Sequence, residues 1–128
     1  MHEKFLFHRD GLRPVAYDGD YGIEAMRHAL REAIGDKATP IIENGKIIGL
    51  KDGDGGSVSL EPGGQLELSG APLGNLHETC AETGRHLRHM RTVSSALGVG
   101  MLGIGFQPIW SREDISWMPK GRYQIMRK

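Results

Sequence analysis

The segment from Ser59 to Pro72, SLEPGGQLELSGAP, carries two carboxylates at a spacing that could support metal chemistry. Side chains alternate between the faces of a strand, so Glu61, Gln65 and Glu67 are expected to share one face. The other face is then apolar and consists of Val58, Leu60, Leu66 and Leu68. Mg²⁺ binds to such oxygen-rich surfaces through one or two carboxylates and completes its coordination with water and phosphate.

The same alternation also describes an ordinary antiparallel sheet with one face in water. Pro62, Gly63 and Gly64 interrupt the pattern, where they could insert a bulge or let a ligand approach the backbone closely. The spacing of the carboxylates alone therefore leaves a metal site and a solvated sheet face as open alternatives.

Length, charge and cysteine content limit the class of protein. A chain of 128 residues can bury one core, so a single unit over residues 1–128 is expected. Its 16 basic and 16 acidic residues cancel, which gives no overall field that favours nucleic acid or an anionic membrane. Cys80 is the single cysteine and cannot form an internal disulfide. Without a signal peptide or an apolar run near the roughly 20 residues of a membrane span, the sequence predicts a cytoplasmic protein.

The elements that must position these carboxylates follow from periodicity and turn residues. They are a strand over residues 2–9, a helix over 21–34, a hairpin that turns at Asn44-Gly45, a long helix over 75–98, a strand over 99–105 and a final helix within 118–128. Asp20 is expected to cap the start of the first helix, and Gly35 is expected to end it. Together these elements predict an α+β fold with a mainly antiparallel sheet.

One stripe of the long helix is expected to pack on the sheet. Its members recur at three- and four-residue steps and are Leu76, Cys80, Thr83, Leu87, Met90, Ser94 and Leu97. Cys80 is thus interpreted as a core residue, and Glu82 is placed on the solvent side. His86 and His89 lie between arginines and lack a third partner at a metal-ligand spacing, which favours a solvated basic face over a zinc site.

Three motifs together resemble the glutamate–cysteine ligase family of plants and alphaproteobacteria. They are the run from Ile47 to Glu82, the segment GIGFQPIW, and the final MPKGRYQIMRK, and the similarity begins at HEKF near the start of the chain. Such ligases belong to the glutamine-synthetase-like superfamily of carboxylate–amine ligases. The resemblance implies that residues 1–128 form the amino-terminal portion of a catalytic domain, with part of an antiparallel sheet and a long helix on one face.

The resemblance also implies a reaction. It is the ATP-dependent joining of the glutamate γ-carboxylate to the cysteine amine through a γ-glutamyl phosphate, the first step of glutathione biosynthesis. Phosphoryl transfer between anions depends on metal ions for positioning and charge neutralisation, which implies Mg²⁺ together with ATP. Glu61 and Glu67 match the strand carboxylates of the family and are assigned to metal and substrate contacts. Gln65, on the same face, is a second candidate for contacts with the cofactor.

Two further segments match motifs of the family. Glu3 lies in Met1-His2-Glu3-Lys4-Phe5, where the family has EHEKF, so one of two carboxylates of this motif is absent and Glu3 is the expected metal ligand. Arg122 and Tyr123 match the GRY of MPKGRY, which implies a place near the acceptor pocket, where a guanidinium and a phenol suit a substrate carboxylate. An exposed helix-face arginine and a packed tyrosine remain the alternative.

The main departure from the family is length, because its members are several times longer. We therefore expect little catalysis from these 128 residues alone, and the exposed edges of an open half-sheet predict weak stability or self-association. The alternatives to a glutamate–cysteine ligase are a non-catalytic remnant or binding module, and a carboxylate–amine ligase with another amine substrate.

Overall fold

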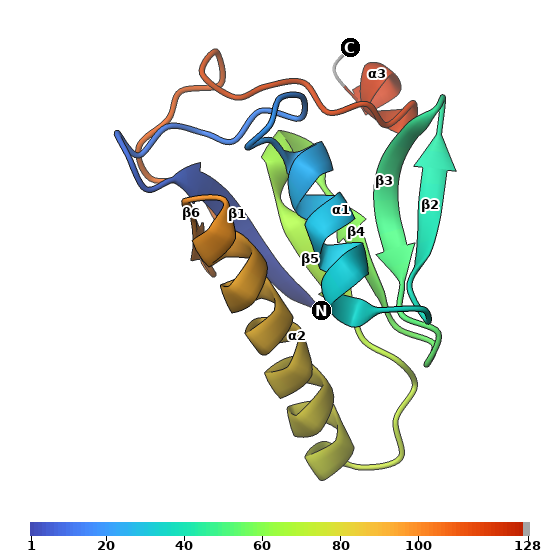
Figure 1. Cartoon of the computed structure of the whole chain (residues 1–128). Helices are drawn as coiled ribbons and strands as arrows, with labels where there is room; N and C mark the ends of the chain where they lie inside the picture. Colours follow the sequence, from blue (N-terminus) through green and yellow to red (C-terminus); the bar gives the residue numbers. More distant parts are fainter. Residues whose placement is uncertain (127–128) are drawn as a thin grey trace.

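The computed structural model describes residues 1–126 and contains a six-stranded sheet that carries two helices on one face (Figure 1). The elements are β1 (His2–His8), α1 (Ile23–Ile34), β2 (Thr39–Glu43), β3 (Lys46–Lys51), β4 (Ser57–Leu60), the short 3₁₀ turn η1 (Pro62–Gly64), β5 (Leu66–Ser69), α2 (Leu76–Ala96), β6 (Val99–Leu102) and α3 (Arg122–Met126). The strand order is β2-β3-β4-β5-β1-β6, and neighbouring strands are antiparallel. The predicted α+β class is thus confirmed. No helix in the described part of the chain is long and apolar enough to cross a membrane.

The β2–β3 hairpin turns where the sequence predicts it. Asn44 and Gly45 occupy the turn with φ values of 51° and 76°, a left-handed conformation that asparagine and glycine tolerate. Gly35 ends α1 with a φ of 87°, also as predicted. The start of α1 differs, because Gly22 rather than Asp20 is the cap residue. A Cβ atom at position 22 would lie 2.5 Å from the Asp18 carbonyl oxygen, so glycine is required there.

The strands β4 and β5 keep the predicted alternation across the Pro-Gly-Gly interruption. Gly63 and Gly64 absorb the reversal at φ values of 76° and 81°, and Leu60 is then paired with Leu66 and Ser59 with Glu67. The apolar side chains Val58, Leu60, Leu66 and Leu68 are buried under the helices. The polar row lies on the opposite side of the sheet, which we call the open face, and consists of Ser59, Glu61, Gln65 and Glu67.

The long helix α2 packs on the sheet through a stripe that includes Met90 and Ser94 of the predicted one, with Leu97 partly buried against the core, but that differs from the prediction in its first half. Its buried residues are Glu82, His86, Met90, Val93 and Ser94, whereas Leu76, Cys80 and Leu87 are exposed. The prediction of Cys80 as a core residue is therefore wrong. The first turns of α2 extend beyond the ends of the strands (Figure 1), so apolar residues there have no sheet surface to cover.

Two polar residues of α2 are buried because each has a partner distant in the sequence. The Glu82 carboxylate accepts a hydrogen bond from the Ala71 backbone N–H at 2.8 Å, and a Cβ atom at Gly70 would lie 2.4 Å from that carboxylate. The His86 Nε2 atom lies 2.9 Å from the Lys4 ammonium on β1. The predicted solvated position of both side chains is wrong, since a polar group can be buried once it is hydrogen-bonded.

The strand β6 is shorter than predicted and pairs with the second half of β1. The chain then runs along the end of the sheet to α3, beside the loop that follows β1 (Figure 1). Trp110 fixes this path, because its indole N–H donates a hydrogen bond of 2.9 Å to the Leu12 carbonyl oxygen. The predicted final helix forms as α3, and its last two predicted residues lie outside the described residues.

Candidate active site

Two carboxylates from different strands face each other on the open face. Glu3 of β1 is the direct partner of Glu67 of β5, and Glu67 is in turn opposite Ser59 of β4. Side chains at such positions have Cβ atoms about 4.5–5.5 Å apart, where two negative charges repel each other. Ser69 donates a hydrogen bond of 2.8 Å to Oε1 of Glu67 and partly stabilises this charge. The arrangement is one that a cation would stabilise further.

The donor set of this pair fits a hard divalent cation. Mg²⁺ uses one or two protein carboxylates and keeps several water or phosphate oxygens. Residues 1–126 contain no cluster of three or more histidine, cysteine, aspartate or glutamate side chains that could hold a metal. Glu3 and Glu67 thus offer a two-carboxylate site rather than a complete protein cage, which suits Mg²⁺ carried with a nucleotide.

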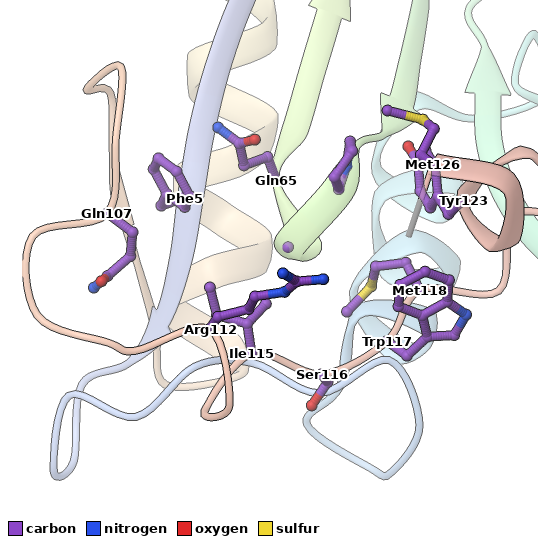
Figure 2. A pocket seen from close by; sticks show the side chains of 12 residues that line it. Phe5, Gln65, Gln107, Arg112, Ile115, Ser116, Trp117, Met118, Tyr123 and Met126 are labelled. Atoms are coloured by element: carbon purple, nitrogen blue, oxygen red, sulfur yellow. The ribbon is translucent and has the colours of Figure 1, made fainter. Parts of the chain in front are cut away.

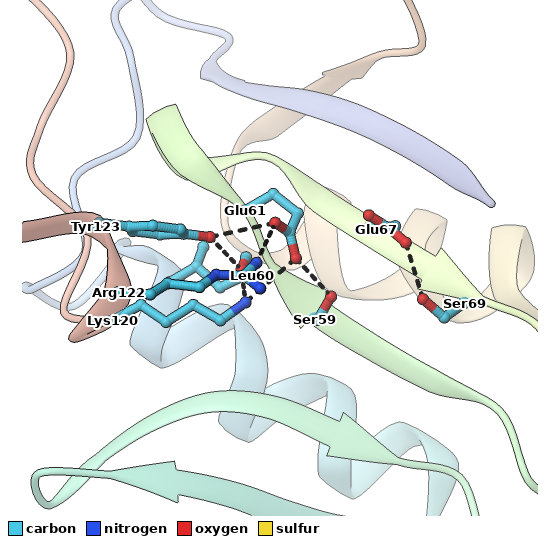
Figure 3. Close-up of polar contacts among 8 residues, drawn as sticks. All are labelled: Ser59, Leu60, Glu61, Glu67, Ser69, Lys120, Arg122 and Tyr123. Carbon is cyan, nitrogen blue, oxygen red and sulfur yellow. Dashed lines mark hydrogen bonds and ion pairs between the residues drawn. The ribbon is translucent and has the colours of Figure 1, made fainter. Parts of the chain in front are cut away.

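Glu61 belongs to a separate cluster at the end of β4 (Figure 3). Its Oε1 accepts hydrogen bonds from Ser59 Oγ at 3.0 Å and Lys120 Nζ at 3.2 Å. Its Oε2 accepts from Arg122 Nη2 at 2.9 Å and Tyr123 Oη at 3.2 Å. We call Glu61, Lys120, Arg122 and Tyr123 the Glu61 cluster. Both carboxylate oxygens are already engaged, so a metal ion at Glu61 would have to displace cationic partners.

The protonation states follow from this geometry. Burial alone would raise the pKa of Glu61, but the Ser59 hydrogen bond and the charges of Lys120 and Arg122 lower it overall, so the carboxylate is ionised at neutral pH. Burial raises the pKa of Tyr123 to about 12, which keeps its phenol protonated as a donor. Tyr123 also reaches the Leu60 carbonyl oxygen at 3.0 Å. The cluster therefore ties the segment before α3 to the end of β4.

Glu61→Gln is expected to loosen that tie. The Lys120 side chain is only 13% exposed, and the substitution removes its ionic partner. We expect a loss of about 1–3 kcal/mol in the free energy of unfolding, with faster amide hydrogen exchange over residues 120–126. The matched control is Asp54→Asn in the exposed Lys37–Asp54 pair, where the change should stay below about 0.5 kcal/mol. Unchanged exchange in α3 would show that Glu61 does not hold this segment.

A cavity of about 500 Å³ lies between the open face and the segment that leads to α3 (Figure 2). Gln65 and Phe5 line it from the sheet, and Trp117 and Tyr123 line it from the later segment. Figure 2 shows the guanidinium of Arg112 extending toward the middle of these side chains. A mainly apolar cavity with one guanidinium and the amides of Gln65 and Gln107 suits a small ligand that carries a carboxylate.

The structure thus divides the predicted site residues among three neighbouring places. Glu67 joins Glu3, Gln65 lines the cavity, and Glu61 joins Arg122 and Tyr123. Two contributing cations were missed by reasoning from the sequence. Lys120 lies within the MPKGRY motif and could have been included from that motif, but Arg112 has no local signal, because its place depends on the path of the chain after β6.

Comparison with known proteins supports the resemblance of the motifs. Residues 2–128 match the model of Glutamate-cysteine ligase family 2 (GCS2). The chain is 53% identical over 126 residues to the chloroplastic glutamate–cysteine ligase of Arabidopsis thaliana and 54% identical over 127 residues to chloroplastic glutamate–cysteine ligase A of Oryza sativa subsp. japonica. It is 52% identical over 128 residues to the chloroplastic enzyme of Medicago truncatula. These alignments cover 98% or 99% of the chain but only 23% or 24% of each relative.

The names of these relatives contradict the predicted cytoplasmic location, because they are chloroplastic proteins. That prediction rested on the opening residues and on the lack of an apolar run of membrane-spanning length, and neither feature excludes a chloroplast protein. The match over residues 2–128, the identities above 50% and the open face with its carboxylates agree with one another. The chain therefore belongs to Glutamate-cysteine ligase family 2.

Proposed function

We propose that this chain forms part of an ATP- and Mg²⁺-dependent glutamate–cysteine ligase that acts in glutathione biosynthesis. In this reaction a γ-carboxylate oxygen of glutamate attacks the terminal phosphorus of ATP, and ADP leaves. The cysteine amine then attacks the acyl carbon of the γ-glutamyl phosphate, phosphate leaves, and the amine loses a proton as the amide forms. Both steps bring anions together, so charge neutralisation and positioning dominate the barrier.

The observation that carries this proposal is the Glu3–Glu67 pair on the open face of a chain in this family. We assign the two carboxylates to Mg²⁺, which when bound would neutralise charge on the transferring phosphate. Ser69 orients Glu67 through the hydrogen bond to Oε1. Glu61 stays a predicted ligand for metal or substrate, and in that role it would exchange Lys120 and Arg122 for the incoming group.

The cavity supplies the proposed place for substrate. We assign the Arg112 guanidinium to a substrate carboxylate and the Gln65 amide to a second polar contact. Tyr123 lines the same cavity and donates to Glu61, which connects the cavity to the Glu61 cluster. Arg122 is more than half exposed, so it could approach an anionic group from the solvent side.

The test combines turnover with metal binding. In a full-length ligase that contains these residues, ADP release from ATP should require glutamate, cysteine and Mg²⁺, and Glu67→Gln should lower its rate by about 100-fold. In the ¹⁵N-labelled chain, Mn²⁺ should broaden the amide signals of residues 3 and 67, and Glu67→Gln should abolish this broadening. The control is Glu32→Gln, an exposed carboxylate on α1. Mn²⁺ binding without ADP release would favour the alternative, a non-catalytic binding module, whereas absence of both would reject the metal assignment.

A further inference from the structure

The backbone around Glu3 is supported on one side only. Residues 2–4 of β1 pair with β5, and residues 5–8 pair with β6. In the described part of the chain, each half of β1 thus has one neighbouring strand. Glu3 lies in the half without β6, close to the start of the strand. Strand ends with a single neighbour fray readily, so the pairing of Glu3 with Glu67 needs another source of support.

Lys4 supplies a connection to the helix layer. Its side chain lies on the opposite face from Glu3 and is only 2% exposed. The ammonium donates hydrogen bonds to Nε2 of His86, at 2.9 Å, and to the carbonyl oxygen of His2, at 3.1 Å. His86 lies on α2, 82 residues away in the sequence. The first half of β1 is therefore held to β5 through its backbone and to α2 through Lys4.

We propose that Lys4 and His86 are positioning residues that hold Glu3 in register opposite Glu67. The proposal rests on the metal role that the proposed function gives to this pair. A shift of β1 by one residue would move Glu3 to the helix face and Lys4 to the open face. A buried ammonium with a fixed acceptor opposes that shift, because in any other register Lys4 would lose its partner.

A purely structural role predicts a different response to mutation. Two buried hydrogen-bond partners can often be replaced together by apolar side chains with little loss of stability. If Lys4 and His86 contributed only to the stability of the core, the double variant Lys4→Met/His86→Leu would restore both stability and metal binding. If they position Glu3, that variant should regain stability yet still bind metal weakly.

The experiment titrates the ¹⁵N-labelled chain with Mn²⁺, follows the broadening of the residue 67 amide, and measures nuclear Overhauser contacts between residues 3 and 67. His86→Leu and the double variant should bind Mn²⁺ about tenfold more weakly, with weaker contacts between residues 3 and 67. His86→Gln keeps an acceptor for Lys4 and should stay within about twofold of the wild-type affinity. Val93→Ala, a buried α2 variant, controls for lost stability and should keep both readouts.

Wild-type Mn²⁺ affinity and intact contacts between residues 3 and 67 in the double variant would overturn the proposal. The two readouts also separate this inference from the metal assignment. If the wild-type chain showed no broadening at residue 67, the metal site would be rejected. The Overhauser contacts in the same variants would then still decide whether Lys4 and His86 fix the register of Glu3.

Discussion

Lowering the pH from 6 to 5 is expected to reduce the free energy of unfolding by about 1.2 kcal/mol through His86 alone. Burial, together with the charges of Lys4, His2 and His89, lowers the pKa of His86 from its ordinary 6.5 to about 3. Over this range the unfolded state binds a proton at this ring and the folded state does not. The contribution of His86 to the free energy of unfolding therefore rises with pH between about 3 and 6.5, and it is lost again as the pH falls through this range.

The measurement is a series of urea unfolding curves between pH 4.5 and 7. His86→Gln should remove most of the slope, because glutamine does not titrate and still accepts a hydrogen bond from Lys4. The control is His28→Gln on the exposed side of α1, which should retain the wild-type slope. An equal slope in wild type and His86→Gln would show that the ring is protonated in the folded protein.

The partner of His86 has the complementary effect at high pH. Burial lowers the pKa of Lys4 to about 8, so the unfolded chain binds the extra proton between about pH 8 and its ordinary 10.5. Stability should thus rise again above pH 8. Burial raises the pKa of Tyr17 and of Tyr123 to about 12, so the folded state resists their ionisation and stability falls above pH 10. The expected maximum lies near pH 10, and Lys4→Met should remove the rise that precedes it.

Local patterns predicted the parts of this fold that depend on local physics. The Asn44-Gly45 hairpin follows from the positive φ that both residues tolerate, and the two faces of β4 and β5 follow from alternation. The register of α2 could not be predicted in the same way. Burial of Glu82 and His86 depends on the Ala71 N–H and the Lys4 ammonium, which only the folded chain brings near.

The candidate site also combines features that the local sequence predicts with features that depend on the folded chain. The shared face of Glu61 and Glu67 was predictable from spacing, but their separate partners were not. Glu67 gains Glu3 through strand pairing, whereas Glu61 gains Lys120 and Arg122 because the chain returns along the end of the sheet. The motif MPKGRY indicated which residues approach the site. The path of the chain determines which carboxylate they contact.

Arg27→Met is expected to stabilise the fold by about 1–4 kcal/mol, although it removes a charge from a fully buried side chain. The guanidinium of Arg27 lies beneath the sheet on α1, and Nε, Nη1 and Nη2 have no hydrogen-bond partner among the described residues. An arginine stays charged in proteins, so burial of Arg27 costs the desolvation free energy of a cation. The hydrogen bonds that usually offset this cost are not formed here by the described residues. Methionine is a strong helix former and fills irregular space in a core.

Whether Arg27→Met stabilises or destabilises the fold depends on Glu61. Burial lowers the pKa of Arg27, while the nearby charge of Glu61 favours its charged form. A double-mutant cycle with Glu61→Gln measures this attraction, and the gain from Arg27→Met should be larger when Glu61 is neutral. Arg31→Met, exposed in the last turn of α1, is the control and should change stability by less than about 0.5 kcal/mol.

A loss above 1 kcal/mol for Arg27→Met would mean that Glu61 already compensates the buried charge. Arg27 would then act with Lys120 and Arg122 as a third cation of the Glu61 cluster.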